Sequence, residues 1–512
     1  MKNYKESNKN QKGLSQKQLD AIEHLKLFIG EVPDDLVFNG NLNLSDKLVK
    51  MLPDNMVVNG NLDLDDCCNL DELPLNLTVN GNLRIDSCMN GISLRPCTKI
   101  KGNFERAWHD NIPENFTIGG DLIVSYINKL PDGLTIGGNL DLSKSKLNEL
   151  PKRLKVLGNL KIESLPITEL PKDLYVGGYL NASHTQIKSF PESVVVKGGF
   201  RINDTKIRVF PRQFSHIIGD VTITNTDIRK LPDNLTVVGG LFLDNTPVSE
   251  LPENLHVYGA LSIGGTYVET LPESLKLEDS LYLEHCPIEK LPENLMIKGT
   301  LNICDSNIEE IPAGLIIDGD FEFSRSCIKE LPPFMNVGSL HISNTKMAEL
   351  PENFSVTGNC SIWYCEDEDV YLTKLPKGFK VGGNLRLSKN LYGSLPEGLF
   401  VGGCLDLTEQ RNMQKLPKDF NVKGILKLDR QHEGIRDFLL GKISIDGIVE
   451  MTFDGYQMGN VMAYHVTDDI KARLSRDGDV VTLSPAPKEA PKNQNGGELR
   501  KTPTKAKVLA EA

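Results

Sequence analysis

The sequence predicts a β-rich repeat solenoid of about twenty coils, with a helical cap at its N-terminal end and a small α+β cap at its C-terminal end. Three observations support this fold class. Proline recurs about every 20 residues from Pro33 to Pro417, apolar and polar residues alternate after each proline, and a glycine follows seven residues after nearly every one. A unit this short cannot bury its own apolar face, so successive units must stack on one another.

The unit PDNLTVVGGLFLDNTPVSEL begins at Pro232 and illustrates the repeat; positions are counted with the proline as zero. Apolar residues at +3, +5, +9 and +11 alternate with polar ones, which is the pattern of a half-buried strand. Gly239, at +7, interrupts this alternation. A glycine required so regularly indicates a positive φ, a tight corner or a close approach between coils. Proline fixes φ and lacks an amide donor, so it should end the strand and turn the chain.

The period also divides the chain. Residues 15–31 are predicted to form the helical cap, because Leu19, Ile22 and Leu25 follow a possible N-cap at Ser15 with helical spacing. The predicted parts are a flexible basic N-terminus at 1–14, the helical cap at 15–31, the solenoid at 32–428, a C-terminal cap or small module at 429–483, and a disordered Pro/Lys/Ala tail at 484–512. The cap at 429–483 should combine helical stretches near 435–440 and 467–474 with strands at 443–453 and 479–483.

Charge narrows the class of partner. The formal net charge is −12, yet residues 1–30 and 485–512 each carry more Lys and Arg than acids, so the body between them is strongly acidic. This excludes a broad nucleic-acid binder and favours a basic protein partner. The sequence contains no signal-peptide pattern and no apolar run long enough to span a membrane. Ten cysteines without a CxxC pair are typical of reduced thiols rather than a zinc ribbon.

Stretches such as LSIGGTYVETLP (261–272) and LNICDSNIEEIP (301–312) resemble leucine-rich repeats, in which a small polar residue follows the strand. Thr246, Thr266, Cys286 and Ser306 occupy that position here. The repeat length and the Leu-Pro step are similar to the short repeats of bacterial type III secreted effectors, and the tandem units also resemble phage-borne repeat proteins. The resemblance implies a protein-binding scaffold connected with virulence, located in the cytoplasm or delivered into a host cell by a non-Sec route.

The outward positions of the strand suggest where binding occurs. At +8 the early units carry Asn41, Asn61, Asn82 and Asn103, for which we expect a ladder of side chains stacked amide on amide. The residues at +10 vary from unit to unit, as suits a recognition surface, although a face that is merely solvated would vary too. The predicted binding residues are the aromatic anchors Phe242 and Tyr282 at +10, and Trp363 and Tyr364 in an acidic insertion at 351–375.

Catalytic motifs are weak. Cys365 is followed by Glu366 and Asp367, and effector ubiquitin ligases with leucine-rich repeats carry a similar Cys-x-Asp site. That site belongs to a large helical domain after the repeats, whereas Cys365 lies within the array. We therefore predict no enzyme activity, no cofactor, no metal and no small-molecule substrate.

The predicted function is a non-catalytic protein–protein interaction scaffold that uses an extended repeat face. One alternative is a structural or spacer repeat protein of a phage or bacterium, in which length matters and no face is special. A second alternative is an enzyme whose site lies in residues 429–483.

Overall fold

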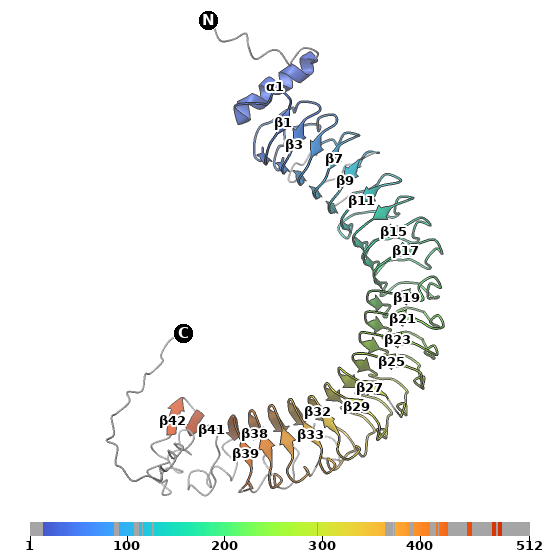
Figure 1. Cartoon of the computed structure of the whole chain (residues 1–512), viewed down its shortest axis with the longest axis vertical. Coiled ribbons are helices and arrows are strands. Elements are labelled where there is room, and N and C mark those ends of the chain that lie inside the picture. The colour runs from blue at the N-terminus through green and yellow to red at the C-terminus, as the bar shows by residue number, and fades with distance from the viewer. Residues whose placement is uncertain are drawn as a thin grey trace, which may run out of the picture.

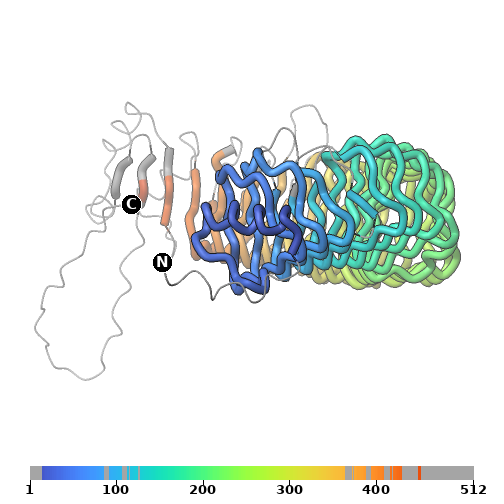
Figure 2. The backbone as a smooth tube through the Cα atoms, turned by 90° about the horizontal axis from the view of Figure 1, so that it is seen from above, coloured from blue at the N-terminus to red at the C-terminus, as the bar shows by residue number. Residues whose placement is uncertain are grey.

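The computed structural model describes residues 14–85, 92–106, 112–114, 116–124, 127–293, 295–363, 372, 374–388, 394–409, 416–417, 419–428, 448–452, 474–477 and 480–483. The stacked coils form an open arc with helix α1 (Gln16–Ile29) at one end (Figure 1). Seen from above, the coils lie one behind another and keep a nearly uniform height along the array (Figure 2). The predicted repeat solenoid is confirmed.

The predicted N-terminal helix is also confirmed. The Ser15 hydroxyl accepts the backbone N–H of Gln18 at 3.3 Å, and the Gln18 side chain accepts the Ser15 N–H at 3.2 Å, which completes a capping box. Ile22 and Leu25 are buried, and Leu25 joins the continuous core that runs through the coils. The helix therefore covers the apolar end of the first coil.

Each coil contributes one strand to a long parallel ladder, in which every strand pairs with its equivalent in the next coil. In Figure 1, β32 and β38 of this ladder lie along the inner edge of the arc. The strands are β2 (Leu42–Asn43), β4 (Leu62–Asp63), β6 (Leu83–Ile85), β8 (Phe104–Arg106), β10 (Leu122–Val124), β12 (Leu140–Asp141), β14 (Leu160–Lys161), β16 (Leu180–Asn181), β18 (Phe200–Arg201), β20 (Val221–Thr222), β22 (Leu241–Phe242), β24 (Leu261–Ser262), β26 (Leu281–Tyr282), β28 (Leu301–Asn302), β30 (Phe321–Glu322), β32 (Leu340–Ser343), β34 (Cys360–Trp363), β36 (Leu385–Ser388), β38 (Leu405–Glu409) and β40 (Ile425–Leu428).

A second set of short strands, also paired in parallel between coils, precedes the glycine corner of each unit. The sequence pattern suggested one strand across these positions; the corner at +7 divides it in two. The second set comprises β1 (Val37–Phe38), β3 (Val57–Val58), β5 (Thr78–Val79), β7 (Lys99–Ile100), β9 (Thr117–Ile118), β11 (Thr135–Ile136), β13 (Lys155–Val156), β15 (Tyr175–Val176), β17 (Val195–Val196), β19 (His216–Ile217), β21 (Thr236–Val237), β23 (His256–Val257), β25 (Lys276–Leu277), β27 (Met296–Ile297), β29 (Ile316–Ile317), β31 (Asn336–Val337), β33 (Ser355–Val356), β35 (Lys380–Val381), β37 (Phe400–Val401) and β39 (Asn421–Val422).

Close packing between coils explains the glycine at +7. A Cβ at Gly158 would lie 2.6 Å from Oδ1 of Asn139 and 2.7 Å from the carbonyl carbon of Gly138, both in the preceding coil. Among the described +7 glycines only Gly40, in the first coil, has a positive φ. Of the three reasons that the sequence allowed, the close approach between coils is therefore the one that applies.

The asparagine ladder at +8 differs from the prediction. The carbonyl oxygen of each side chain accepts the backbone N–H of the +8 residue in the next coil, and not a neighbouring side-chain amide. Oδ1 of Asn139, for example, accepts from the N–H of Asn159 at 2.7 Å. Asp121 makes the same contact to Asn139 at 2.6 Å. These side chains continue the hydrogen bonding between coils past the glycine at +7. Without them, the backbone N–H of each +8 residue would have no protein partner.

Positive φ angles occur instead at two other positions of the unit. Residues at +2 and +13 adopt the left-handed region, as at Asn234 (φ 55°) and Asn245 (φ 56°), and glycine replaces asparagine at Gly133 and Gly265. Asn, Asp and Gly tolerate this conformation better than other residues. The two turns bring the chain back to the start of the next coil.

The small residue at +14 lies inside the coil, as the sequence predicted. The hydroxyl of Thr246 donates to the carbonyl of Leu243 at 2.6 Å, and Thr266 donates to Ile263 at 2.7 Å. Cys286 is buried at the same position, and its sulfur donates to the Ile263 carbonyl at 2.9 Å. The carbonyls of Leu243 and Ile263 also accept the backbone N–H of Thr246 and of Thr266 at 3.2 Å, so the small side chain supplies an additional donor inside the coil.

Beyond the coils the strand pairing changes from parallel to antiparallel. β41 (Ile448–Thr452) pairs with β40 in parallel, whereas β43 (Val480–Leu483) runs antiparallel to both β41 and β42 (Leu474–Asp477). The helical stretch expected near 435–440 lies outside the described residues, and so does 467–474 except for Leu474, which begins a strand.

Candidate functional site

The candidate site is built on the strand ladder from β22 to β30. Each strand here places one side chain into the core and the next outward. The inward residues are uniform and fully buried: Leu241, Leu261, Leu281, Leu301 and Phe321. The outward residues at +10 are in register across the strands and differ in every coil: Phe242, Ser262, Tyr282, Asn302 and Glu322. With the outward +12 residues Asp244, Gly264, Glu284, Cys304 and Ser324, they form what we call the central face.

Two half-buried aromatic side chains lie at one end of this face. The ring of Phe242 lies over Gly240, because a Cβ at that glycine would be 2.6 Å from the ring carbon Cε2. Tyr282 lies two strands further along, about 9.6 Å away at the usual strand spacing. The strand between them carries only Ser262 and Gly264 on its outer side. The central face therefore carries only small outer residues between the two aromatic rings.

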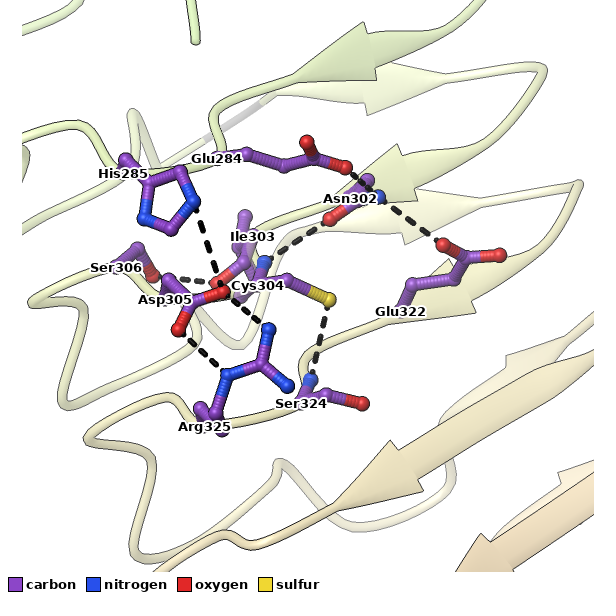
Figure 3. A network of polar contacts seen from close by, with 10 residues as sticks. All are labelled: Glu284, His285, Asn302, Ile303, Cys304, Asp305, Ser306, Glu322, Ser324 and Arg325. Atoms are coloured by element: carbon purple, nitrogen blue, oxygen red, sulfur yellow. Dashed lines mark hydrogen bonds and ion pairs between the residues drawn. The ribbon is translucent and has the colours of Figure 1, made fainter. Parts of the chain in front are cut away.

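The central face also carries three carboxylates, and each accepts hydrogen bonds from neutral groups. Asp244 accepts the backbone N–H of Gly264 at 2.9 Å and the hydroxyl of Ser262. The side-chain nitrogen of Asn302 donates to Glu284 at 2.6 Å and to Glu322 at 3.0 Å, so that the two glutamates lie on either side of one amide (Figure 3).

Elsewhere on the ladder, carboxylates have basic partners in a neighbouring coil. The closest nitrogen–oxygen distances are 3.1 Å for Arg84–Asp65, 3.8 Å for Lys161–Asp141 and 3.4 Å for Lys427–Glu450. From Thr222 to Trp363 the +10 and +12 rows contain no Lys or Arg. On the central face, the carboxylates at +10 and +12 thus have no Lys or Arg beside them in these two rows.

An ion pair at the +13 turns borders this face (Figure 3). Both oxygens of Asp305 accept from Arg325, at 2.7 Å and 2.6 Å, and His285 lies 3.9 Å from the same carboxylate. The hydrogen bond from Arg325 holds the pKa of Asp305 below its usual value. This pair links adjacent coils, since Asp305 and Arg325 occupy the same position in successive units.

The structure separates the predicted binding residues into two groups. Phe242 and Tyr282 share one row and one face. Trp363 ends β34 and has 46% of its surface exposed, but it lies four strands beyond Tyr282, about 19 Å along the ladder. Tyr364 lies outside the described residues, as does Cys365. The carboxylates Asp244, Glu284 and Glu322 were not predicted; the period shows that Lys and Arg are absent from their rows, but not that the three lie on one face.

Two of the described thiols, Cys360 and Cys67, are poor nucleophiles at neutral pH. Burial raises the pKa of Cys360 far above its ordinary value and that of Cys67 to about 11, so both remain protonated at neutral pH. Within the described ranges no group of His, Cys, Asp and Glu has the arrangement of a metal site. No helix among those residues is long and apolar enough to cross a membrane. Residues 429–483, proposed above as an alternative enzyme site, are described only at β41, β42 and β43.

Two open depressions also lie on the array. One, of about 670 Å³, is lined by the Leu-Pro steps at Pro131 and Pro151 together with Lys129, Asp132 and Lys152. The other, of about 230 Å³, lies on the ladder near Asp63, Arg84 and Glu105. Both are open to solvent and are lined by side chains of both charges.

Comparison with known proteins adds one structural likeness. The fold is similar to that of YopM from Yersinia enterocolitica WA-314, with a TM-score of 0.36, 16% sequence identity, and coverage of 77% of this chain and 90% of that one. No protein-family model matches the chain, and no curated protein matches it.

Proposed function

We propose that this chain is a non-catalytic scaffold that binds an extended segment of another protein along its strand ladder. The observation that carries the proposal is the contrast between the two sides of the ladder. Inward residues stay Leu or Phe from β22 to β30, whereas outward residues change from Phe242 to Ser262, Tyr282, Asn302 and Glu322. Stacked repeats that vary on one face are suited to recognising a partner along their length.

Partner capture tests this proposal. Phe242 and Tyr282 are both replaced by alanine, and the captured proteins are compared with those bound by the wild-type chain. The matched control replaces Tyr258 and Met296 by alanine, because these aromatic and apolar residues are 46% and 52% exposed and lie outside the central face. We expect the first variant to lose partners and the second to retain them. An unchanged set of partners with the Phe242/Tyr282 variant would show that the chosen face is wrong.

The place of action is a separate proposal that rests on the sequence resemblance. The Leu-Pro step and the 20-residue unit resemble the short repeats of secreted effectors, so we propose that the partner is a protein of a host cell. Capture from host lysate and from bacterial lysate should therefore differ, with face-dependent partners found in the former. Face-dependent partners found only in the bacterial lysate would overturn the host assignment while leaving the scaffold function intact.

A further inference from the structure

We propose that the central face binds an extended, arginine-containing basic segment of its partner, with one guanidinium group lying between the rings of Phe242 and Tyr282. This inference rests on the proposed binding function and adds the chemistry of the partner. Three observations support it: the spacing of the two aromatic residues, the negative charge of the face, and the length of the stretch of strands whose outward rows lack Lys and Arg.

The aromatic pair fits a planar cation. Phe242 and Tyr282 stand two strands apart, about 9.6 Å, and the strand between them offers the small outer residues Ser262 and Gly264. A flat group stacked between two rings needs about 7–8 Å from ring to ring, so the strand spacing leaves room for one. Arginine is the side chain that combines a flat shape with a positive charge, and it stacks on aromatic rings.

The carboxylates are placed to meet that cation. Asp244 follows Phe242 by two residues, and Glu284 follows Tyr282 by two, so each aromatic residue has a carboxylate in the turn directly after its strand. Both carboxylates are already oriented by hydrogen bonds, to Gly264 at 2.9 Å and to Asn302 at 2.6 Å. Oriented carboxylates can accept the paired N–H groups of a guanidinium without first losing side-chain freedom.

The charge of the whole face points to the same partner. Asp244, Glu284 and Glu322 accept from Ser262, Gly264 and Asn302, which are neutral donors and leave the negative charge in place. The neighbouring Arg325 is engaged by both oxygens of Asp305. A face with several carboxylates and no basic neighbour in its rows attracts a positively charged segment and repels an acidic one.

The dimensions define the segment. The five strands from β22 to β30 span four strand spacings, about 19 Å. An extended peptide covers that distance with about six residues at 3.3 Å each. Basic side chains on alternate residues of such a peptide would all point toward the face.

The probe for the test is a fluorescein-labelled peptide of about eight residues in which Gly and Arg alternate, with otherwise identical Gly/Lys and Gly/Glu peptides for comparison. Binding to the full chain is followed by fluorescence anisotropy at low and high salt. The first variant combines Asp244→Asn, Glu284→Gln and Glu322→Gln, which keep an acceptor oxygen for the structural hydrogen bonds. The second is Phe242→Ala with Tyr282→Ala. The control combines Asp63→Asn and Asp141→Asn, on the same row outside the central face.

We expect the arginine peptide to bind best, the lysine peptide more weakly and the glutamate peptide not at all. Each central-face variant should raise the Kd by about tenfold, and the control should change it by less than about twofold. Equal losses in the control and central-face variants would overturn the proposal, since the whole acidic body would then attract the peptide. Equal binding of the glutamate peptide would overturn it as well.

Two other occupants are distinguished by the same assay. If a chain that lacks 484–512 binds the peptide much more tightly than the full chain, the basic tail occupies the face and the partner assignment is wrong. If the wild-type chain self-associates and the triple variant is monomeric in sedimentation, a second copy occupies it and the assignment is again wrong. If the peptide fails to bind but partner capture still depends on Phe242 and Tyr282, only the partner chemistry is wrong and the scaffold function stands.

Discussion

Replacing Gly158 by alanine should weaken one junction of the array by about 2–4 kcal/mol. The new Cβ would lie 2.6 Å from Oδ1 of Asn139 and 2.7 Å from the carbonyl carbon of Gly138, well inside contact distance. Overpacking of this kind costs about 1–3 kcal/mol. The displaced Asn139 would also lose its 2.7 Å hydrogen bond from the N–H of Asn159, which contributes about 1 kcal/mol.

The assay is equilibrium unfolding in urea followed by far-UV circular dichroism. Glu169→Ala, a change at an exposed position later in the same unit, is the control and should stay within about 0.5 kcal/mol of wild type. Asn139→Ala should cost only the hydrogen bond, about 1 kcal/mol, and Asn139→Asp should cost little because Asp121 already makes this contact one coil earlier. If Gly158→Ala unfolds with the same free energy as the Glu169 control, close approach between coils is not the reason for the glycine.

Three further changes test other parts of the fold. Thr246→Val should lower the free energy of unfolding by about 1 kcal/mol, because the Leu243 carbonyl loses the Thr246 hydroxyl and keeps only the backbone N–H of Thr246 at 3.2 Å. Thr246→Ser should keep both donors, and urea unfolding measures both variants. Arg325 holds the pKa of Asp305 below its ordinary 3.8, so the stability from this pair is present above that pH and is lost as the pH falls through the lower folded value. The stability difference between wild type and Asp305→Asn should therefore shrink in acid, and a difference that persists there would contradict the ion pair. Iodoacetamide at neutral pH should modify the exposed Cys68 and leave Cys360 unmodified, because burial raises the pKa of the Cys360 thiol; mass spectrometry of the native chain would reveal any contrary labelling.

The period in the sequence was sufficient to predict the repeat architecture. Prolines at fixed intervals mark the units, and the alternation around Leu241 and Leu243 identifies the strand whose inward side forms the core. The interior place of Thr246 followed from its regular position. These features depend on burial and period alone, which one chain displays many times over.

The roles of individual polar residues were harder to predict. Gly158 and Asn159 are neighbours in sequence, but the role of Gly158 depends on the preceding coil and that of the Asn159 side chain on the following one, and the period does not specify the position of either coil. The left-handed turns at Asn234 and Asn245 were not predicted, although Asn and Gly recur at those positions. The three carboxylates of the central face become a group only when the register of the ladder is known.

Photocrosslinking from the ladder is the most direct test of the central claim, that the central face holds the partner. Benzoylphenylalanine replaces Phe242 in one chain and Tyr258 in another; the first lies on the central face and the second outside it. Each chain is irradiated with the captured partner, and the crosslinked products are compared on denaturing gels. A partner crosslinked from position 242 and not from 258 is the predicted result. Crosslinking from 258 alone would contradict the account.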